Sequence, residues 1–234
     1  MPNRKNLYTF PRKAVFPFVD EAIIAAYVAQ NDCKQIGEFL SVTKAFPIYE
    51  TIHNGQTICL CQAPVGASAA VQFLDFLIGY GAEEIISAGS CGALVDFLEN
   101  KFLIPTEALR DEGVSYHYLP PSRSVMLNMC AVDAIKVALQ KRNMPFTTCK
   151  TWTTDGFYRE TAGMVAYRKS EGCTVVEMEC AGLAACAAFR SATFGQILFT
   201  ADTLANTAVY DERDWGYASH SPALELALDA VCEL

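Results

Sequence analysis

The stretch from Val175 to Ala185 constrains the fold of this chain more than any other. The apolar pair Val175-Val176 leads into Glu177 and Glu179, and a run of small residues follows as far as Ala185. Such small residues predict a tightly packed helix, and unpaired charge between a buried strand and a buried helix is costly. We therefore interpret the two carboxylates as the substrate end of an enzyme.

Strand-like and helix-like segments alternate along the rest of the 234 residues. Strands are predicted at 45–52, 57–62, 84–88, 101–109, 146–153 and 193–201, with Asn54-Gly55 in the hairpin loop between the first two. Helices are predicted after the N-cap candidate Asp20 with weak continuation to Val42, at 69–79, at 126–142, up to Gly172, and at 222–231. Residues 1–17 are expected to form an irregular arm. This order predicts one α/β domain over residues 1–234, a central mixed sheet flanked by helices.

The composition narrows the class of ligand. The net charge is −8 and the 18 basic residues are scattered singly, which argues against a nucleic-acid-binding surface and favours a small molecule. Ten cysteines in apolar contexts, without a zinc-binding spacing, predict buried, reduced thiols. The longest apolar run, 180–189, is too short to cross a membrane, and the N-terminal region lacks the apolar core of a signal peptide. We expect a cytoplasmic protein that binds neither membrane nor metal.

The run Gly89-Ser90-Cys91-Gly92 is predicted to turn at the carboxyl end of a buried strand. Backbone amides and the Ser90 hydroxyl would point at an anion there, because glycine tolerates the dihedrals and leaves room for a ligand. A tight turn without a ligand is an equal alternative. No dinucleotide cofactor is expected, because Gly79-x-Gly81 does not complete the fingerprint of such a site.

Asp202 ends the last predicted strand. Because α/β sheets bind ligands along the carboxyl edge of their strands, an acid in this place suggests a functional group, and a helix N-cap is the alternative. The polar segment from Asp202 to Ser219 is interpreted as a lid. His117 lies between two tyrosines and is interpreted as a packed loop residue rather than a general base.

Three stretches together resemble the nucleoside phosphorylase family, which includes purine nucleoside phosphorylases, uridine phosphorylases and methylthioadenosine nucleosidases. They are 87–93, 176–182 and 199–202, and the resemblance covers about 180 residues. It implies cleavage of the N-glycosidic bond of a nucleoside by phosphate or water, with phosphate as co-substrate and no other cofactor. The residues suit this chemistry, because the ribose gains positive charge and the base gains negative charge as the bond breaks.

The resemblance also implies roles for individual residues. Glu179 matches the glutamate that accepts hydrogen bonds from the ribose hydroxyls, and Asp202 matches the acid that protonates a purine. Met178 would lie under the sugar, with Glu177 beside it, and Phe157 would pack on the base. Ser90 and Gly66 would contact the phosphate, and Lys44 would reach it from a neighbouring subunit. Arg213 would lie beside the acid. The place of Lys44 implies a homo-oligomer, either a dimer or a trimer of dimers.

Two phosphate-holding arginines of the family are replaced in this chain by Ile24 and Ser87. Another cation, such as Arg110, Arg159 or Lys13, is one explanation, since arginine is the preferred phosphate ligand.

The other explanation is that water is the nucleophile and that Asp20 or Glu21 is the base, which makes the enzyme a nucleosidase. A nucleoside-binding protein that has lost its phosphate site is a third alternative. The sequence thus predicts phosphorolysis of a purine nucleoside first and hydrolysis second.

Overall fold

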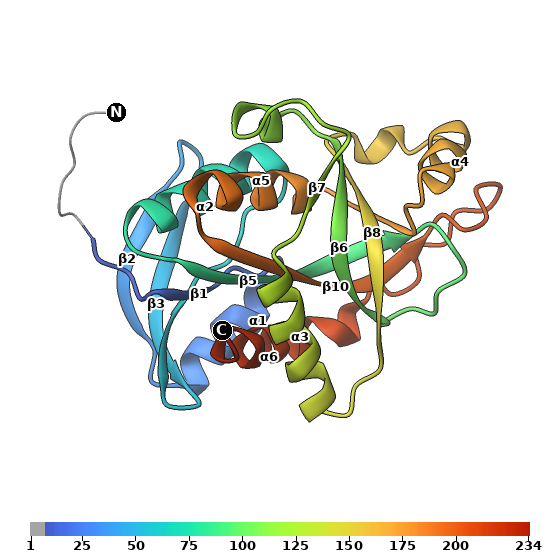
Figure 1. The fold of residues 1–234 in the computed structure, drawn as a ribbon. Helices are drawn as coiled ribbons and strands as arrows, with labels where there is room; N and C mark the ends of the chain where they lie inside the picture. The colour runs from blue at the N-terminus through green and yellow to red at the C-terminus, as the bar shows by residue number, and fades with distance from the viewer. Residues whose placement is uncertain (1–7) are drawn as a thin grey trace.

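One mixed sheet of ten strands forms the centre of the computed structural model, which describes residues 8–234 (Figure 1). The strands are β1 (Lys13–Val15), β2 (Lys34–Leu40), β3 (Ala45–His53), β4 (Gln56–Leu60), β5 (Glu84–Ala93), β6 (Phe102–Asp111), β7 (Ser124–Met126), β8 (Phe146–Thr154), β9 (Val175–Glu177) and β10 (Thr193–Thr203). Their order is β10-β6-β8-β9-β5-β1-β4-β3-β2, with β7 beside β6. The predicted α/β fold is confirmed.

The strands β5 and β10 form one of the two longest pairings of this sheet. They pair in parallel from Glu84↔Thr193 to Ala93↔Thr203, and this pairing closes β10, β6, β8, β9 and β5 into a ring. The short strand β9 crosses the end of β5 in antiparallel register, with Val176 opposite Gly92. The short strand β9 therefore lies beside the carboxyl ends of β5 and β10, at the edge where α/β sheets bind their ligands.

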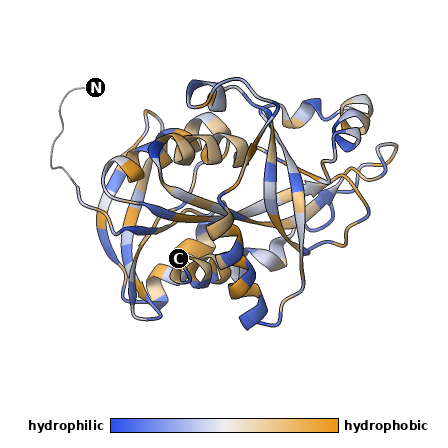
Figure 2. Cartoon of the chain, viewed as in Figure 1, coloured by the Kyte–Doolittle hydropathy of each residue, from blue (hydrophilic) through white to orange (hydrophobic). Residues whose placement is uncertain are grey.

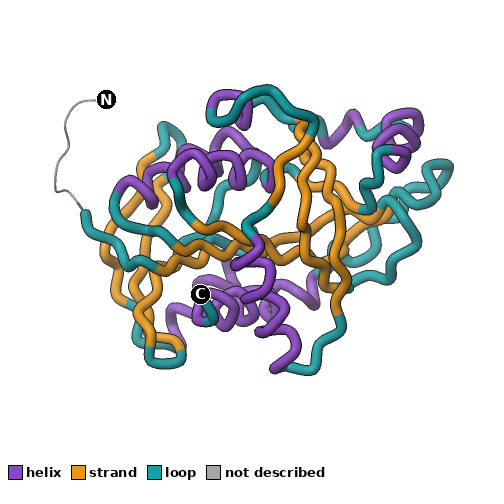
Figure 3. The backbone as a smooth tube through the Cα atoms, in the orientation of Figure 1, coloured by secondary structure: helices purple, strands orange, loops and turns teal. Residues whose placement is uncertain are grey.

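Helices cover both faces of the sheet, as Figures 1 and 3 show. The α-helices within residues 8–234 are α1 (Glu21–Gln30), α2 (Ala67–Gly79), α3 (Met129–Lys141), α4 (Ala162–Ser170), α5 (Cys180–Arg190) and α6 (His220–Cys232), and the short 3-10 helices are η1 (Val114–His117), η2 (Phe157–Arg159) and η3 (Tyr217–Ser219). The pair α2 and α5 lies on one face, and the pair α3 and α6 lies on the other. In Figure 2, hydrophilic residues gather at the exposed end of α3 and in the outer loops.

The small residues of α5 pack tightly, as the sequence predicts. Every residue from Cys180 to Ala187 is buried. A side chain at Gly182 would bring its Cβ within 2.9 Å of Val114 Cγ1 and 3.1 Å of Val71 Cγ2. Because only a residue without a side chain fits this distance, α5 can approach α2 closely.

Two expectations for the amino-terminal region are wrong. The expected arm falls partly outside the described residues, but Lys13–Val15 forms the buried strand β1 between β4 and β5. Three residues bounded by prolines are too few to give a periodic pattern. The expected helix ends at Gln30, and Lys34–Leu40 pairs with β3 as an edge strand. Its mixed, mostly exposed residues lack the apolar alternation by which a strand is recognised.

The predicted glycine-rich turn is also wrong, because residues 89–92 continue the extended strand β5. The glycines serve close packing: a Cβ at Gly89 would lie 3.1 Å from the Phe18 Cβ, and one at Gly92 would lie 3.0 Å from Val176 Cγ1. The helix predicted at 126–142 begins later, at Met129, where Asn128 caps it, and the preceding residues form β7.

All ten cysteines are unpaired, which confirms the expected free thiols. Seven are buried, whereas Cys33 and Cys232 are half-buried and Cys130 is exposed, contrary to the expectation that all are buried. Among residues 8–234, no helix combines the length and the apolar character that crossing a membrane requires.

Candidate active site

A cavity of about 340 Å³ opens where the ends of β5, β9 and β10 meet. Six of the predicted site residues line it: Ser90, Phe157, Glu177, Met178, Glu179 and Asp202. They come from four separate segments of the chain, so the fold brings together residues that lie far apart in the sequence. The predicted Gly66, Lys44 and Arg213 do not line this cavity.

Glu179 stands at the N-terminus of α5 and is buried, with 6% of its surface exposed. Its Oε1 accepts a hydrogen bond of 2.6 Å from the Gly66 N–H, so Gly66 holds the carboxylate rather than facing the cavity. Gly66 has a φ of +97°, a conformation that favours glycine. Burial, followed by the charge of Glu177, raises the pKa of Glu179, whereas the Gly66 N–H lowers it. One carboxylate oxygen remains for a ligand.

Glu177 lines the same cavity, but both oxygens of its carboxylate accept hydrogen bonds from the protein itself. Oε2 accepts hydrogen bonds of 2.7 Å from the N–H groups of Glu179 and Cys180, which are orphan donors at the start of α5. Oε1 accepts hydrogen bonds from the hydroxyls of Thr153 at 2.6 Å and Thr151 at 3.2 Å. These four bonds join β8, β9 and α5, and they give Glu177 a structural function.

Replacing Glu177 with alanine should therefore destabilise the protein. Four buried donors would lose their acceptor, and we expect the free energy of unfolding in urea to fall by about 2–4 kcal/mol. Glu177→Gln retains one acceptor oxygen and should cost less. If Glu177→Ala unfolds like the wild type and only raises KM, the carboxylate binds substrate instead of supporting the fold.

Asp202 lies at an irregularity near the end of β10, where the pairing with β5 shifts register. Its Oδ2 accepts a hydrogen bond of 3.1 Å from the Tyr210 hydroxyl. Burial raises the pKa of Asp202, and the Tyr210 hydroxyl and the charge of Arg213 oppose this. Arg213 itself donates to the carbonyl oxygens of Phe97 at 2.8 Å and Ala201 at 3.4 Å, so it acts on the acid through its charge.

The expected substitute cations do not line the cavity. Arg110 is buried and donates to Ser115 Oγ, Ser122 Oγ and two carbonyl oxygens outside the cavity. Lys13 donates to the Val231 carbonyl oxygen and pairs with Glu84. In the part of the chain that the structure describes, no lysine or arginine lines the cavity wall.

Other charged candidates also lie elsewhere. The Lys44 side chain is 46% exposed and stands 3.5 Å from Glu21. Asp20 caps α1 through the Ala22 N–H, and neither Asp20 nor Glu21 lines the cavity. Arg159 and His117 are exposed outside it.

Several further lining residues were not predicted, among them the polar or aromatic side chains of Gln62, Glu160, Gln196, Trp215 and His220. Gln196 is 1% exposed and its Oε1 has no hydrogen-bond partner among residues 8–234. A polar residue inside the apolar strand 193–201 was a visible signal for it. His220 Nδ1 accepts a hydrogen bond of 3.0 Å from the Asp20 N–H, and burial lowers the pKa of His220. Its imidazole is thus neutral near pH 7.

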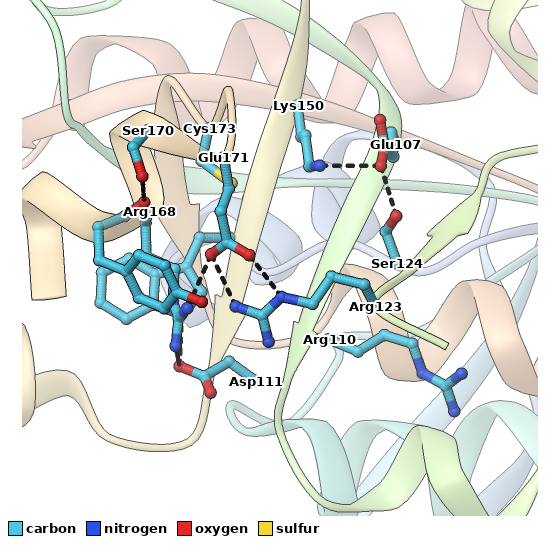
Figure 4. Close-up of polar contacts among 12 residues, drawn as sticks. Glu107, Arg110, Asp111, Arg123, Ser124, Lys150, Arg168, Ser170, Glu171 and Cys173 are labelled. Carbon is cyan, nitrogen blue, oxygen red and sulfur yellow. Dashed lines mark hydrogen bonds and ion pairs between the residues drawn. The ribbon is translucent and has the colours of Figure 1, made fainter. Parts of the chain in front are cut away.

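Ion pairs fix the helix that follows the Phe157 segment (Figure 4). Arg168 on α4 contacts Asp111 Oδ2 at 2.9 Å and Glu171 Oε2 at 2.8 Å, and only 5% of its side chain is exposed. Arg123 pairs with the same Glu171 at 2.6 Å. Through Asp111 these ion pairs join α4 to the end of β6, beside the Phe157 segment of the cavity wall, while the buried Arg168 Nε has no hydrogen-bond partner within residues 8–234.

The paired strand ends and the buried carboxylates form a cavity at the edge of an α/β sheet, the place where α/β proteins bind small ligands. The sequence profile of the phosphorylase superfamily matches residues 23–232. The chain belongs to this superfamily, and the family predicted from the sequence is confirmed.

Two curated relatives show how far this chain has diverged in sequence. A DeoD-type purine nucleoside phosphorylase of Myxococcus xanthus is 27% identical over 211 residues, which are 88% of this chain and 87% of the relative. A uridine phosphorylase of Haemophilus influenzae is 26% identical over 122 residues, which are 52% of this chain. That match spans 48% of the uridine phosphorylase, about half of its length.

Solved structures share the fold. The uridine phosphorylase of Vibrio fischeri superimposes with a TM-score of 0.82 at 18% identity, covering 98% of this chain and all of that one. An AMP nucleosidase of Bacteroides thetaiotaomicron superimposes with a TM-score of 0.75 at 21% identity, covering 95% of this chain and 88% of that one. At such identities the likeness establishes the architecture.

Proposed function

We propose that this protein cleaves the N-glycosidic bond of a nucleoside, preferably a purine nucleoside. The observation that supports this most is that two buried carboxylates from separate elements, Glu179 and Asp202, face one cavity. The apolar side chains Met178 and Phe157 line the same space and suit the flat faces of a sugar and a base.

The chemistry assigns a different function to each acid. Glu179 accepts hydrogen bonds from the ribose hydroxyls through its free oxygen and stabilises the positive charge that develops on the sugar. Asp202, whose pKa burial raises, gives its proton to the base while the electron pair of the breaking C–N bond moves to the base nitrogen. The nucleophile bonds to the anomeric carbon, and the proton lost to the base returns to Asp202 from solvent.

Phosphate is the first candidate nucleophile. Curated relatives of this chain are phosphorylases that act on uridine, guanosine and purine nucleosides. Ser90 lines the cavity and offers a hydroxyl to an anion. Lys44 does not line the cavity of its own chain, so a cation from a second copy of the chain would complete the site in a homo-oligomer.

Water is the second candidate, and the cavity wall favours it. Near Ser87, where the family has an arginine, the neighbouring strand places Gln196 in register. Gln196, Gln62 and the neutral His220 give the cavity uncharged hydrogen-bonding groups. Its acidic side chains are those of four residues, and no lysine or arginine among residues 8–234 lines it to balance a phosphate. Such a wall suits a neutral nucleophile better than a phosphate dianion.

A single assay separates these candidates. Inosine, adenosine, methylthioadenosine and uridine are incubated with the protein with and without phosphate, and free base and sugar products are measured. Ribose 1-phosphate formed only with phosphate supports phosphorolysis, and free ribose at a rate indifferent to phosphate supports hydrolysis. If calorimetry shows tight nucleoside binding and no product forms, the proposed enzymatic activity is wrong and the protein is a nucleoside-binding protein.

A further inference from the structure

A second chamber of about 500 Å³ adjoins the active-site cavity. The two spaces share the side chains of Phe157, Glu160 and Trp215, which line both. Tyr158 before α4 and Tyr210 from the segment after β10 form further parts of its wall. The chamber is thus an extension of the cavity rather than a separate surface hollow.

The chamber lies at the end of the cavity where the leaving base would sit. Tyr210, which lines the chamber, donates its hydroxyl hydrogen bond to Asp202 Oδ2 at 3.1 Å. Phe157, the residue that would stack on the base, is shared by both spaces. A base held between Phe157 and Asp202 would therefore point its far edge into the chamber.

The chamber wall combines exposed aromatic side chains with the polar residues Thr161, Asn206 and Thr207. Tyr158 is 93% exposed, Tyr210 is 49% exposed and Trp215 is 46% exposed. Apolar surface gathered around a hollow next to a ligand site is typical of a binding groove. Rings arranged in this way would bury an aromatic or branched alkyl group favourably.

Glu160 supplies a polar group at the junction. Within residues 8–234 its carboxyl is influenced by burial and by the charge of Asp202, and no hydrogen bond or ion pair engages it. Burial, with the nearby charge of Asp202, raises the pKa of Glu160 to about 8, so it is largely protonated at neutral pH. A protonated carboxyl offers one donor and one acceptor, which matches a ring nitrogen beside an exocyclic N–H.

We propose that the chamber binds a substituent on the exocyclic nitrogen of a purine-type base, with Glu160 accepting the N–H that remains. The preferred substrates would be N-substituted aminopurine nucleosides whose substituent is aromatic or branched alkyl. This inference rests on the proposed function for its assignment of the base end. It makes Glu160 and the chamber walls determinants of specificity.

Binding of free bases tests the chamber without requiring turnover. By calorimetry at pH 7, N6-benzyladenine should bind about tenfold more tightly than adenine, because the chamber buries its ring. N6-benzyl-N6-methyladenine keeps the ring but lacks the N–H for Glu160, so it should lose most of that gain. Equal or weaker binding of N6-benzyladenine, or no binding of either base, would overturn the proposal.

A pair of tryptophan substitutions identifies the chamber as the binding place. Ala162 lines it from the exposed first turn of α4, so Ala162→Trp should fill it and remove the tenfold preference while adenine binds as before. Gly163→Trp is the control, because a Cβ there meets nothing within 4 Å and Gly163 does not line the chamber. If both variants keep the preference, the benzyl group binds elsewhere. Absence of nucleoside cleavage would refute the proposed function but leave this affinity ratio intact.

Discussion

Asp202→Asn is expected to lower kcat for a purine nucleoside by about 10²–10⁴-fold while the affinity for the nucleoside changes little. Asparagine keeps the shape of the side chain and can still accept the Tyr210 hydrogen bond, but it has no carboxyl proton to give to the leaving base. Turnover measured under saturating substrate and binding measured by calorimetry separate the two effects.

The dependence of turnover on pH tests the function of Asp202 in a second way. Because burial raises the pKa of Asp202, the protonated acid persists to a higher pH than an ordinary aspartic acid. Turnover of the wild type should decline as the pH rises through that value, and Asp202→Asn should lack this decline. Asp96→Asn, at an exposed aspartate outside the cavity, is the matched control. Unchanged turnover in Asp202→Asn would remove the acid function.

Glu179→Gln should lower kcat/KM by about 10²–10³-fold, because the amide oxygen would stay on the Gly66 N–H and the remaining NH2 group cannot accept hydrogen bonds from the ribose hydroxyls. The effect should be smaller for a substrate that lacks ribose hydroxyls, such as a 2′-deoxynucleoside, since it offers Glu179 fewer hydrogen bonds. Steady-state kinetics with the ribo and deoxy substrates measures both expectations.

Unfolding of Glu179→Gln in urea shows whether its lower activity comes from lost catalysis or from misfolding. The pKa of Glu179 is raised in the folded protein, so its contribution to stability is present below the ordinary carboxyl pKa and is lost as the pH rises through the raised value. Glutamine stays neutral, and the variant should resist urea at least as well as the wild type at pH 8. Glu38→Gln, on the exposed edge strand, controls for the loss of one charge. A variant that is both inactive and unstable would assign Glu179 to the fold.

Much of the fold follows from the sequence, because most buried elements carry strong patterns. The hairpin around Asn54-Gly55, the long strands β5, β6, β8 and β10 and the small-residue helix α5 are all present. The short strand β1 and the edge strand β2 were missed, because pairing with distant strands determines them rather than their own residues. The turn predicted at 89–92 is wrong for a related reason. The glycines there make room for Phe18 and Val176, and these neighbours are known only from the structure.

The candidate site was predicted in part. Glu179, Asp202 and Phe157 do line one cavity, and their functions stay predictions until they are measured. The difference between Glu177 and Glu179 could not be seen in the sequence, because it depends on the threonines of β8, which bond to the Glu177 carboxylate but not to that of Glu179. His220 was missed as well, because it reaches the cavity from the start of the last helix.

The parallel pairing of β5 with β10 also determines when the site can exist. The hydrogen bond from Cys91 Sγ to the Phe199 carbonyl oxygen, between these strands, spans 108 residues. Contacts between such distant segments form slowly, because a long loop must close first. During synthesis on a ribosome, the cavity cannot assemble until β10 has left the exit tunnel. A chain truncated before β10 would therefore lack Asp202 and would expose an unpaired edge of β5, the kind of surface that chaperones bind.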